Sequence, residues 1–158
     1  MPRAESPAPQ RAMYVLDSNL YIRALTEPAF AHELDAFQRV SFSELWVSAV
    51  VAFEVAAGAR SDQQAAGYDR WLLRPFRNAK RLLVPSREDW QIVGRIDRSL
   101  RSRGGHSATL TQRSFLNDML IAATCRTTGA TLITANRADF ELIDSAVGFR
   151  FRTDFPAT

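Results

Sequence analysis

The sequence feature that most constrains the fold is an alternation of short apolar runs with longer segments of helical spacing. Each run has three or four residues, which suits a buried strand better than a buried helix. The predicted strands are Met13–Leu16, Leu45–Val47, Arg81–Val84, Thr131–Thr134 and Phe149–Phe151. Strands that alternate with helices are typical of layered α/β proteins with a mainly parallel sheet. In such sheets, ligands bind beyond the carboxyl ends of the strands.

Residues with known preferences for helix ends mark the segments between the strands. Ser18 or Asn19 can cap the first helix, and Ser48 can cap the one that follows the second strand. Ser86 and Asp89 resemble a capping box. The expected helices are 18–25, 28–37, 48–58, 62–71, 86–104, 115–128 and 139–143. A loop rich in Ser and Thr is expected between Gly105 and Ser114.

The length of 158 residues predicts one domain, over 13–155, after a flexible N-terminal tail at 1–12 that contains three prolines. No apolar run approaches the roughly 18 residues of a membrane span, and no signal peptide is indicated. The single cysteine, Cys125, excludes an internal disulfide and a Cys-rich zinc site. We therefore expect a cytoplasmic protein without a membrane partner.

The charges are distributed unevenly along the chain. The segment from Arg60 to Arg113 has 12 basic and 5 acidic residues, a local net charge of +7, whereas the remainder has 8 basic and 12 acidic residues. Such asymmetry is a hint of an anionic partner, although 19 of the 20 basic residues are arginines, which a GC-rich genome would also produce. The candidate RNA-binding residues are Arg95, Arg98, Arg101 and Arg103, although a solvated helix face is the more common reading of such a run.

Four acidic residues stand at positions where a structural carboxylate is unexpected. Asp17 directly follows the first predicted strand, and Asp139 follows the fourth by a few residues. Glu54 and Asp118 interrupt apolar helix faces. Taken alone, Asp17 could be a helix N-cap and Asp139 an ordinary loop residue, but Glu54 and Asp118 are harder to explain in that way.

Carboxylates on buried surfaces are unfavourable unless a cation neutralises them. Arginines could do so, and so could a hard divalent metal such as Mg²⁺ or Mn²⁺, which prefers oxygen ligands. Other catalytic arrangements find little support, because two histidines make no convincing Ser-His-Asp set and Gly104-Gly105 lacks the Gly-Lys-Ser/Thr element of a phosphate-binding loop. A phosphatase with Asp17 as its nucleophile is disfavoured by Asn19, where a second Asp is usual.

Four segments in order, YVLDSNLYI, VSAVVAFEVAAG, FLNDMLIAA and GATLITANRADF, resemble the successive motifs of PIN-domain ribonucleases. Their length and layout are most similar to the VapC-type toxins of bacterial and archaeal toxin–antitoxin pairs. The resemblance covers Met13 to about Phe151, although Asp62 to Arg113 matches only in general layout. It implies a three-layer α/β/α PIN-like fold with a mainly parallel central sheet of four to five strands.

The resemblance also implies a set of catalytic and metal-binding residues. Asp17, Glu54 and Asp118 match the first three acids of the family. Many relatives have Asp at the position of Asn136, and others have Asn there and an acid at the position of Asp139; we expect Asp139 to be the fourth acid, with Asn136 as a polar helper. Asn19 and Thr134 occupy positions where the family often has small polar groups that order the site.

The function implied is metal-dependent endonucleolytic cleavage of single-stranded RNA, with Mg²⁺ or Mn²⁺ as cofactor. A homodimer and a cognate antitoxin protein are the implied partners. A different class of function, a catalytically silent RNA- or protein-binding module, is the alternative, because Asn136 stands where many relatives have an acid.

Overall fold

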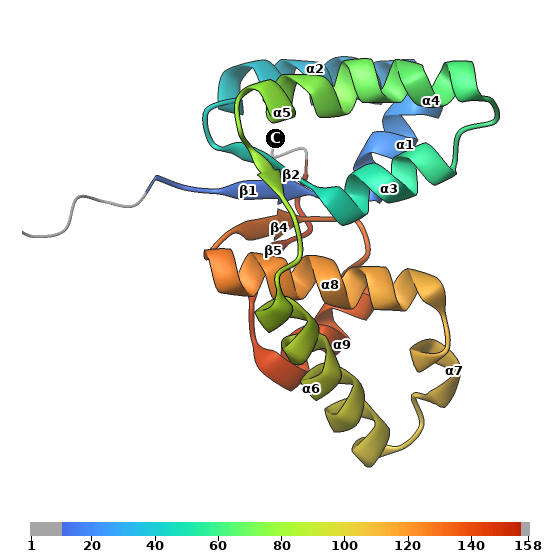
Figure 1. The fold of residues 1–158 in the computed structure, drawn as a ribbon, viewed down its shortest axis with the longest axis vertical. Coiled ribbons are helices and arrows are strands. Elements are labelled where there is room, and N and C mark those ends of the chain that lie inside the picture. Colours follow the sequence, from blue (N-terminus) through green and yellow to red (C-terminus); the bar gives the residue numbers. More distant parts are fainter. Residues whose placement is uncertain (1–10, 156–158) are drawn as a thin grey trace, which may run out of the picture.

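A computed structural model describes residues 11–155 of the chain. The predicted tail at 1–12 therefore lies outside the described residues, apart from its last two. Five parallel strands form one sheet in the order β3-β2-β1-β4-β5 (Figure 1). The strands are β1 (Tyr14–Leu16), β2 (Leu45–Ser48), β3 (Leu82–Leu83), β4 (Thr131–Ile133) and β5 (Arg150–Arg152). This is the sheet that the sequence predicts.

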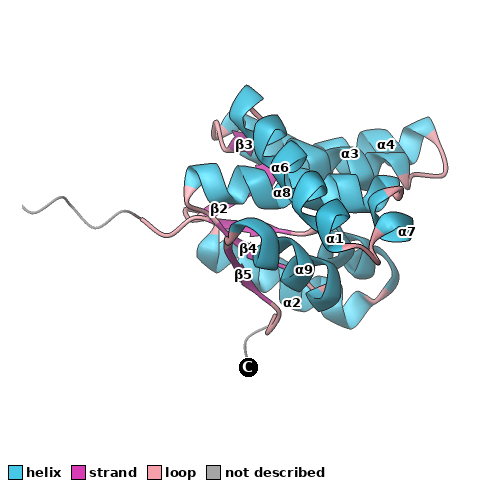
Figure 2. Ribbon diagram, turned by 90° about the horizontal axis from the view of Figure 1, so that it is seen from below, coloured by secondary structure: helices cyan, strands magenta, loops and turns pink. Residues whose placement is uncertain are grey.

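Helices cover both faces of the sheet, as a three-layer fold requires (Figure 1). The upper layer contains α1 (Ser18–Thr26), α2 (Pro28–Ser41), α3 (Ala49–Ala57), α4 (Asp62–Tyr68), the π-helical turn η1 (Asp69–Leu73) and α5 (Arg74–Asn78). The lower layer contains α6 (Arg87–Arg103), α7 (Ser107–Leu110), α8 (Arg113–Thr128) and α9 (Arg137–Val147). Figure 2 shows how short the strands are beside the helices that cover them.

The helix-end residues act largely as the sequence predicts. Ser48 Oγ accepts a hydrogen bond from the Val50 N–H at the start of α3, and Ser86 and Asp89 form a complete capping box at the start of α6. Three residues were possible caps of α1: Asp17 is the N-cap and caps the helix with its own side chain, so the prediction of Ser18 or Asn19 is wrong. The cap thus lies immediately after β1, with no intervening residue.

Other segments also differ from prediction, among them α2, which ends at Ser41 instead of 37. The helix expected at 62–71 continues through a π-helical turn into α5, and Pro75, which has no N–H to donate, lies two residues after the end of that turn. The loop expected between Gly105 and Ser114 contains the four-residue helix α7, and α9 is longer than the predicted 139–143. Short helices such as α7 give too few residues for a recognisable apolar period.

The core lies between the sheet and the two helical layers. Its largest fully buried side chains include Tyr21, Phe115 and Phe140, which come from α1, α8 and α9. Cys125 packs in this core as a small apolar residue. Within residues 11–155, none of the helices combines the length and apolarity that a membrane crossing requires.

The connections after β1, β2 and β4 determine where a site can form. Asp17 follows β1 directly, α3 begins directly after β2, and Thr134 follows β4 directly. Because β1 pairs in parallel with both β2 and β4, these three carboxyl ends lie at one edge of the sheet. The predicted site residues on these connections are therefore brought to the same edge.

Candidate acidic active site

Asp17 is almost fully buried, with 2% of its surface exposed, and both of its oxygens accept hydrogen bonds. Oδ1 accepts from the Ser18 N–H at 2.8 Å, which is the cap of α1. Oδ2 accepts from Thr134 Oγ1 at 2.6 Å and from Asn19 Nδ2 at 2.9 Å. Burial nevertheless raises the pKa of Asp17 to about 6, since the hydrogen bonds offset only part of the desolvation.

Thr134 holds the loop after β4 against the loop after β1. Its hydroxyl donates to Asp17 and accepts from the Asn136 N–H at 2.9 Å and from Asn19 Nδ2 at 3.2 Å. Asn19 Oδ1 accepts from the Ala135 N–H at 3.4 Å. The structure thus brings Thr134 and Asn19 together with Asp17, as small polar residues that fix the position of its carboxylate.

Glu54 lies on α3 and faces α8 across the edge of the sheet. Its Oε1 accepts a hydrogen bond from Asn117 Nδ2 at 3.1 Å. Its Oε2 is buried and has no hydrogen-bond partner among the described residues. Burying a carboxylate oxygen without a hydrogen-bond donor costs free energy. A cation or a hydrogen-bond donor placed beside Oε2 would offset this cost.

Asp118 is the most strongly perturbed of the four acids. It lies inside α8, has 7% of its surface exposed and accepts one long hydrogen bond, from Asn136 Nδ2 at 3.3 Å. Its pKa is raised to about 8, first by burial and then by the negative charges of Asp17, Glu54 and Asp139. All four predicted acids therefore act on one another in a single electrostatic cluster.

Asn136 joins the last two acids. It caps α9, with its Oδ1 accepting from the Asp139 N–H at 3.4 Å. Its Nδ2 donates to Asp139 Oδ2 at 2.9 Å as well as to Asp118. Asn136 and Asp139 are thus not alternatives at one position, since both lie at the site and contact each other.

No arginine or lysine of the described chain forms an ion pair with Asp17, Glu54, Asp118 or Asp139. Arginines and a divalent metal were the two possible means of neutralising these carboxylates. Within residues 11–155, basic side chains do not neutralise them. The four side chains offer only oxygen atoms, which are the ligands that Mg²⁺ and Mn²⁺ prefer. The carboxylate oxygens of the four acids, and the Glu54 Oε2 that has no hydrogen-bond partner, fit such an ion as ligands.

The four acidic side chains do not form a complete metal-binding site in the conformations of this structure. Within the described residues, no three His, Cys, Asp or Glu side chains are arranged to hold one ion directly. The amide of Asn136 separates Asp118 from Asp139 by hydrogen bonding to both. Mg²⁺ commonly uses one or two carboxylates and keeps several waters, so this arrangement is compatible with a partly hydrated ion.

Compared with known families, the sequence matches the PIN domain over residues 14–145, most of the chain. The chain belongs to the PIN-domain family. PIN domains are generally nucleases and generally depend on a divalent metal. None of the curated proteins compared with the sequence matches it.

Solved structures with the same PIN fold include three from bacteria. FitAcB from Neisseria gonorrhoeae has a TM-score of 0.64 and 19% identity, and the match covers 89% of this chain and 97% of that one. DNA-bound VapBC from Salmonella typhimurium has a TM-score of 0.61 and 20% identity, with coverage of 89% and 97%. VapBC-1 from nontypeable Haemophilus influenzae has a TM-score of 0.58 and 21% identity, with coverage of 89% and 96%.

Asn117 is the residue of this PIN domain's site that the sequence reasoning misses. Its buried amide orients Glu54, which is 63 positions away in the sequence. Its adjacency to Asp118 is the only local signal, because the contact depends on how α3 packs against α8. Asp89 shows the opposite case: it is buried outside the site, and Ser86 and Thr127 satisfy its oxygens.

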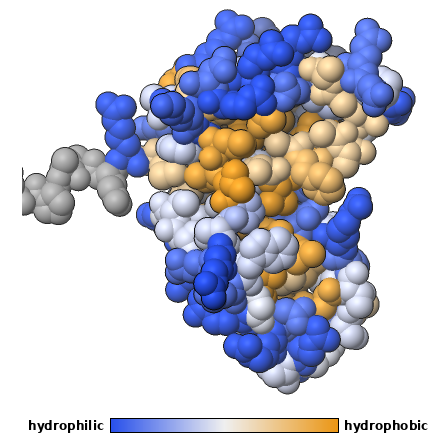
Figure 3. Space-filling view, viewed as in Figure 1, coloured by the Kyte–Doolittle hydropathy of each residue, from blue (hydrophilic) through white to orange (hydrophobic). Residues whose placement is uncertain are grey.

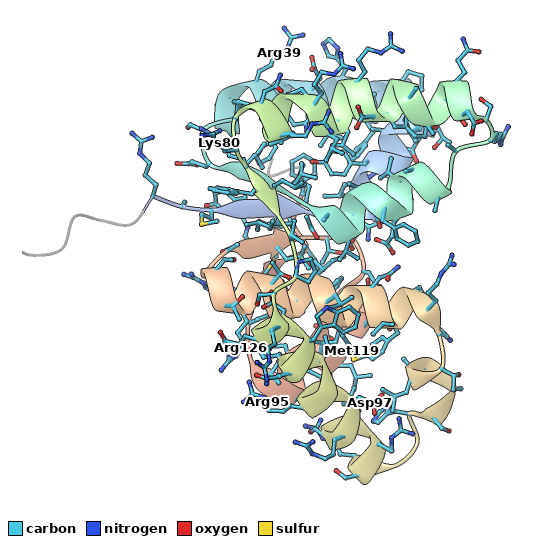
Figure 4. The ribbon with its side chains drawn as sticks, in the orientation of Figure 1. Arg39, Lys80, Arg95, Asp97, Met119 and Arg126 are labelled. Carbon is cyan, nitrogen blue, oxygen red and sulfur yellow. The ribbon has the colours of Figure 1, made fainter. Side chains whose placement is uncertain are left out.

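The four arginines predicted to bind RNA do not lie in the acidic cluster of the PIN domain. Arg101 forms an ion pair with Asp97 at 2.6 Å, and Arg103 donates to Ser145 Oγ at 2.8 Å. Arg95 and Arg98 are exposed on α6. Figure 4 shows Arg95 on the left of α6 and Asp97, the ion-pair partner of Arg101, on its right.

Proposed function

We propose that this PIN domain is a metal-dependent endoribonuclease that cleaves single-stranded regions of RNA. The observation that carries the proposal is the cluster of four carboxylates, which has no basic partner among the described residues and leaves Glu54 Oε2 without a donor. Family membership supports nuclease activity, and the basic middle of the chain supports an anionic substrate.

Asp17, Glu54, Asp118 and Asp139 would hold Mg²⁺ or Mn²⁺, directly or through water. The ion would supply polarisation of the scissile phosphate and activation of a water molecule. Thr134 and Asn19 fix the Asp17 carboxylate, and Asn117 fixes one oxygen of Glu54 so that the other stays free. One carboxylate of the cluster would act as the general base that accepts the proton of the attacking water.

The test is cleavage of single-stranded RNA by the purified protein with millimolar Mg²⁺ or Mn²⁺, compared with Asp118→Asn and Glu54→Gln. Both variants remove a charge with little change of shape. Glu33→Gln, at an exposed position on α2, is the matched control and should retain activity. Metal-dependent cleavage that survives in both site variants, or none in the wild type on any RNA tested, would exclude the proposal.

The PIN domain is further proposed to be the toxin of a VapBC-type pair in a bacterial or archaeal cytoplasm, with a homodimeric state and a cognate antitoxin. The support is the fold shared with VapBC and FitAB structures. Expression of the wild type should arrest growth, and co-expression of a small protein encoded beside it should restore growth. Growth arrest by Asp118→Asn to the same degree would contradict a nuclease toxin.

One observation favours the alternative of a catalytically silent binding module. Asn136, rather than an acid, lies between Asp118 and Asp139, and no three carboxylates hold an ion position directly. Thermal unfolding with Mn²⁺ discriminates the two functions. A functional metal site raises the melting temperature with increasing Mn²⁺, whereas a silent module shows no shift at millimolar metal.

A further inference from the structure

Two hollows on the surface meet beside the acidic cluster. The first has a volume of about 590 Å³ and lies between α1, α3 and the start of α8, with Phe53, Glu54 and Asn117 in its lining. The second has a volume of about 620 Å³ and lies between α6, α7 and α8, with Trp90 and Leu116 in its lining. Gln112 and Arg113 line both hollows, so the two adjoin at these residues, and we call the pair of hollows the groove.

The groove displays two aromatic side chains that a soluble domain would be expected to bury. Phe53 has 50% of its surface exposed and Trp90 has 52%. Phe53 precedes Glu54 on α3 and lines the first hollow. Trp90 lies in the first turn of α6 and lines the second hollow, which also contains Arg113. Figure 3 shows apolar areas over α3 and between α6 and α8 on the face toward the viewer. The chain thus places one half-exposed ring in each hollow.

The charge at the junction of the two hollows is positive. The guanidinium carbon of Arg113 lies 5.9 Å from the centre of the Phe53 ring, and Arg113 forms no ion pair with another residue in 11–155. The acid of the second hollow, Asp97, is already neutralised by Arg101 at 2.6 Å. Figure 4 shows Asp97 and Met119 on the same side of α6, where this hollow lies.

We propose that this groove binds the single-stranded RNA that flanks the scissile phosphate, with one base stacked on Phe53, another on Trp90, and a phosphate held by Arg113 between them. Alternating aromatic rings and cations are the surface that single-stranded nucleic acids require, because every base has a planar face and every link carries one charge. Only at its inner end, at Glu54, does the groove carry an unpaired negative charge. This inference rests on the proposed RNA substrate and assigns Phe53, Trp90 and Arg113 as its positioning residues.

The test measures binding separately from cleavage. Fluorescein-labelled single-stranded RNA of about 12 nucleotides is titrated into the Asp118→Asn protein, and the same substitutions are assayed for cleavage in the otherwise wild-type protein. Trp90→Leu and Phe53→Leu should each weaken binding about 5- to 100-fold, the factor that corresponds to the loss of one stacked base. In the cleavage assay, the same substitutions should raise KM more than they lower kcat.

Conservative substitutions separate stacking from simple apolar packing. Trp90→Phe keeps a planar ring and should retain most of the binding, whereas Trp90→Leu should not. Arg113→Gln should reduce the slope of log Kd against log salt by about 0.7, which corresponds to one phosphate contact on a single strand. The affinity for oligonucleotides that are too short to extend from the acidic cluster past Arg113 to Trp90 should not change when Trp90 is substituted.

Matched controls come from η1, which lines neither of the two hollows. Trp71→Leu removes an aromatic side chain that is 43% exposed on η1, and Arg70→Gln removes an exposed charge beside it. Neither should change RNA binding. If the wild type cleaves RNA but the substitutions of Phe53, Trp90 and Arg113 behave like these controls, the groove inference is wrong and the nuclease function stands. If the same substitutions abolish binding of a protein partner or self-association while RNA binding is unchanged, the groove is a protein interface and the inference is also wrong.

If the wild type neither binds nor cleaves RNA, the proposed function itself fails. If Trp90→Leu and Trp90→Phe bind RNA with the same affinity, Trp90 does not act by stacking on a base. Circular dichroism of each variant verifies that the fold is intact before binding is compared.

Discussion

Neutralising Asp118 should stabilise the metal-free PIN domain at neutral and higher pH. The pKa of Asp118 is raised from 3.8 in the unfolded chain to about 8 in the folded one. A group whose pKa is higher in the folded state favours folding below its unfolded pKa, and this stabilisation is lost as the pH rises through the folded pKa. The wild type without metal should therefore lose stability between pH 4 and pH 8, and Asp17, whose pKa is about 6, contributes in the same direction.

The size of the effect follows from the shift. Four pKa units at about 1.4 kcal/mol each give an upper bound of about 5–6 kcal/mol, and entry of water into the open groove reduces this, so we expect about 2–5 kcal/mol at pH 8. Asn in place of Asp118 can still accept the hydrogen bond from Asn136 and carries no charge, so Asp118→Asn should escape this loss. For a chain of this length, a gain of that size raises the melting temperature by roughly 5–15 °C.

The assay is urea unfolding followed by circular dichroism in EDTA, at several values from pH 4.5 to pH 8, for the wild type, Asp118→Asn and the exposed control Glu33→Gln. Asp118→Asn should match the wild type near pH 4.5 and exceed it increasingly above pH 6, while Glu33→Gln should follow the wild type throughout. A difference between Asp118→Asn and the wild type that does not change with pH would refute the reasoning, because ionisation of Asp118 would then not be the cause.

Three further predictions concern the residues around the cluster. Thr134→Val removes the hydroxyl that Asp17, Asn19 and Asn136 share and should cost about 1–3 kcal/mol in urea unfolding, whereas Thr134→Ser keeps the hydroxyl and should cost less. Asn117→Leu leaves both oxygens of Glu54 without a donor and should lower RNA cleavage or Mn²⁺ affinity about 10- to 100-fold; unchanged values for both would show that Asn117 does not orient Glu54. Ser86→Ala removes the cap of α6 and one partner of the buried Asp89, so it should destabilise the protein by about 1–2 kcal/mol without changing the kcat for RNA cleavage.

Much of the fold and the acidic cluster could be predicted from the sequence because the signals are local. Four of the five strands lie in short, mainly apolar runs, whereas β5 is Arg-Phe-Arg. Ser48, Ser86 and Gly129 mark helix ends, and Glu54 and Asp118 each interrupt an apolar helix face. The carboxyl ends of parallel strands then bring the acids to one edge.

Other features depend on contacts between distant segments. The Asn117–Glu54 hydrogen bond requires α3 and α8 to be packed, and the groove beside Arg113 exists only once α6, α7 and α8 are placed. Asp17, Ser18 and Asn19 are consecutive residues with similar capping preferences, so the sequence leaves each of them possible as the cap of α1, and only the backbone geometry selects Asp17.

The four acids of the cluster differ in how they serve the fold, and this difference separates stability from function. Asp17 caps α1 with one oxygen, and Asp139 is held by Asn136 in the first turn of α9, so substitution at either position disturbs a helix start as well as the site. Glu54 and Asp118 lie inside helices and cap nothing, and burial together with the neighbouring negative charges raises the pKa of Asp118. Ionised Asp118 therefore destabilises the metal-free fold at a position that no helix end needs, which is the pattern expected where function and stability conflict. Asp118→Asn is consequently the substitution that should abolish cleavage while leaving the metal-free protein as stable as the wild type or more so, and Glu54→Gln should abolish cleavage without removing a helix cap.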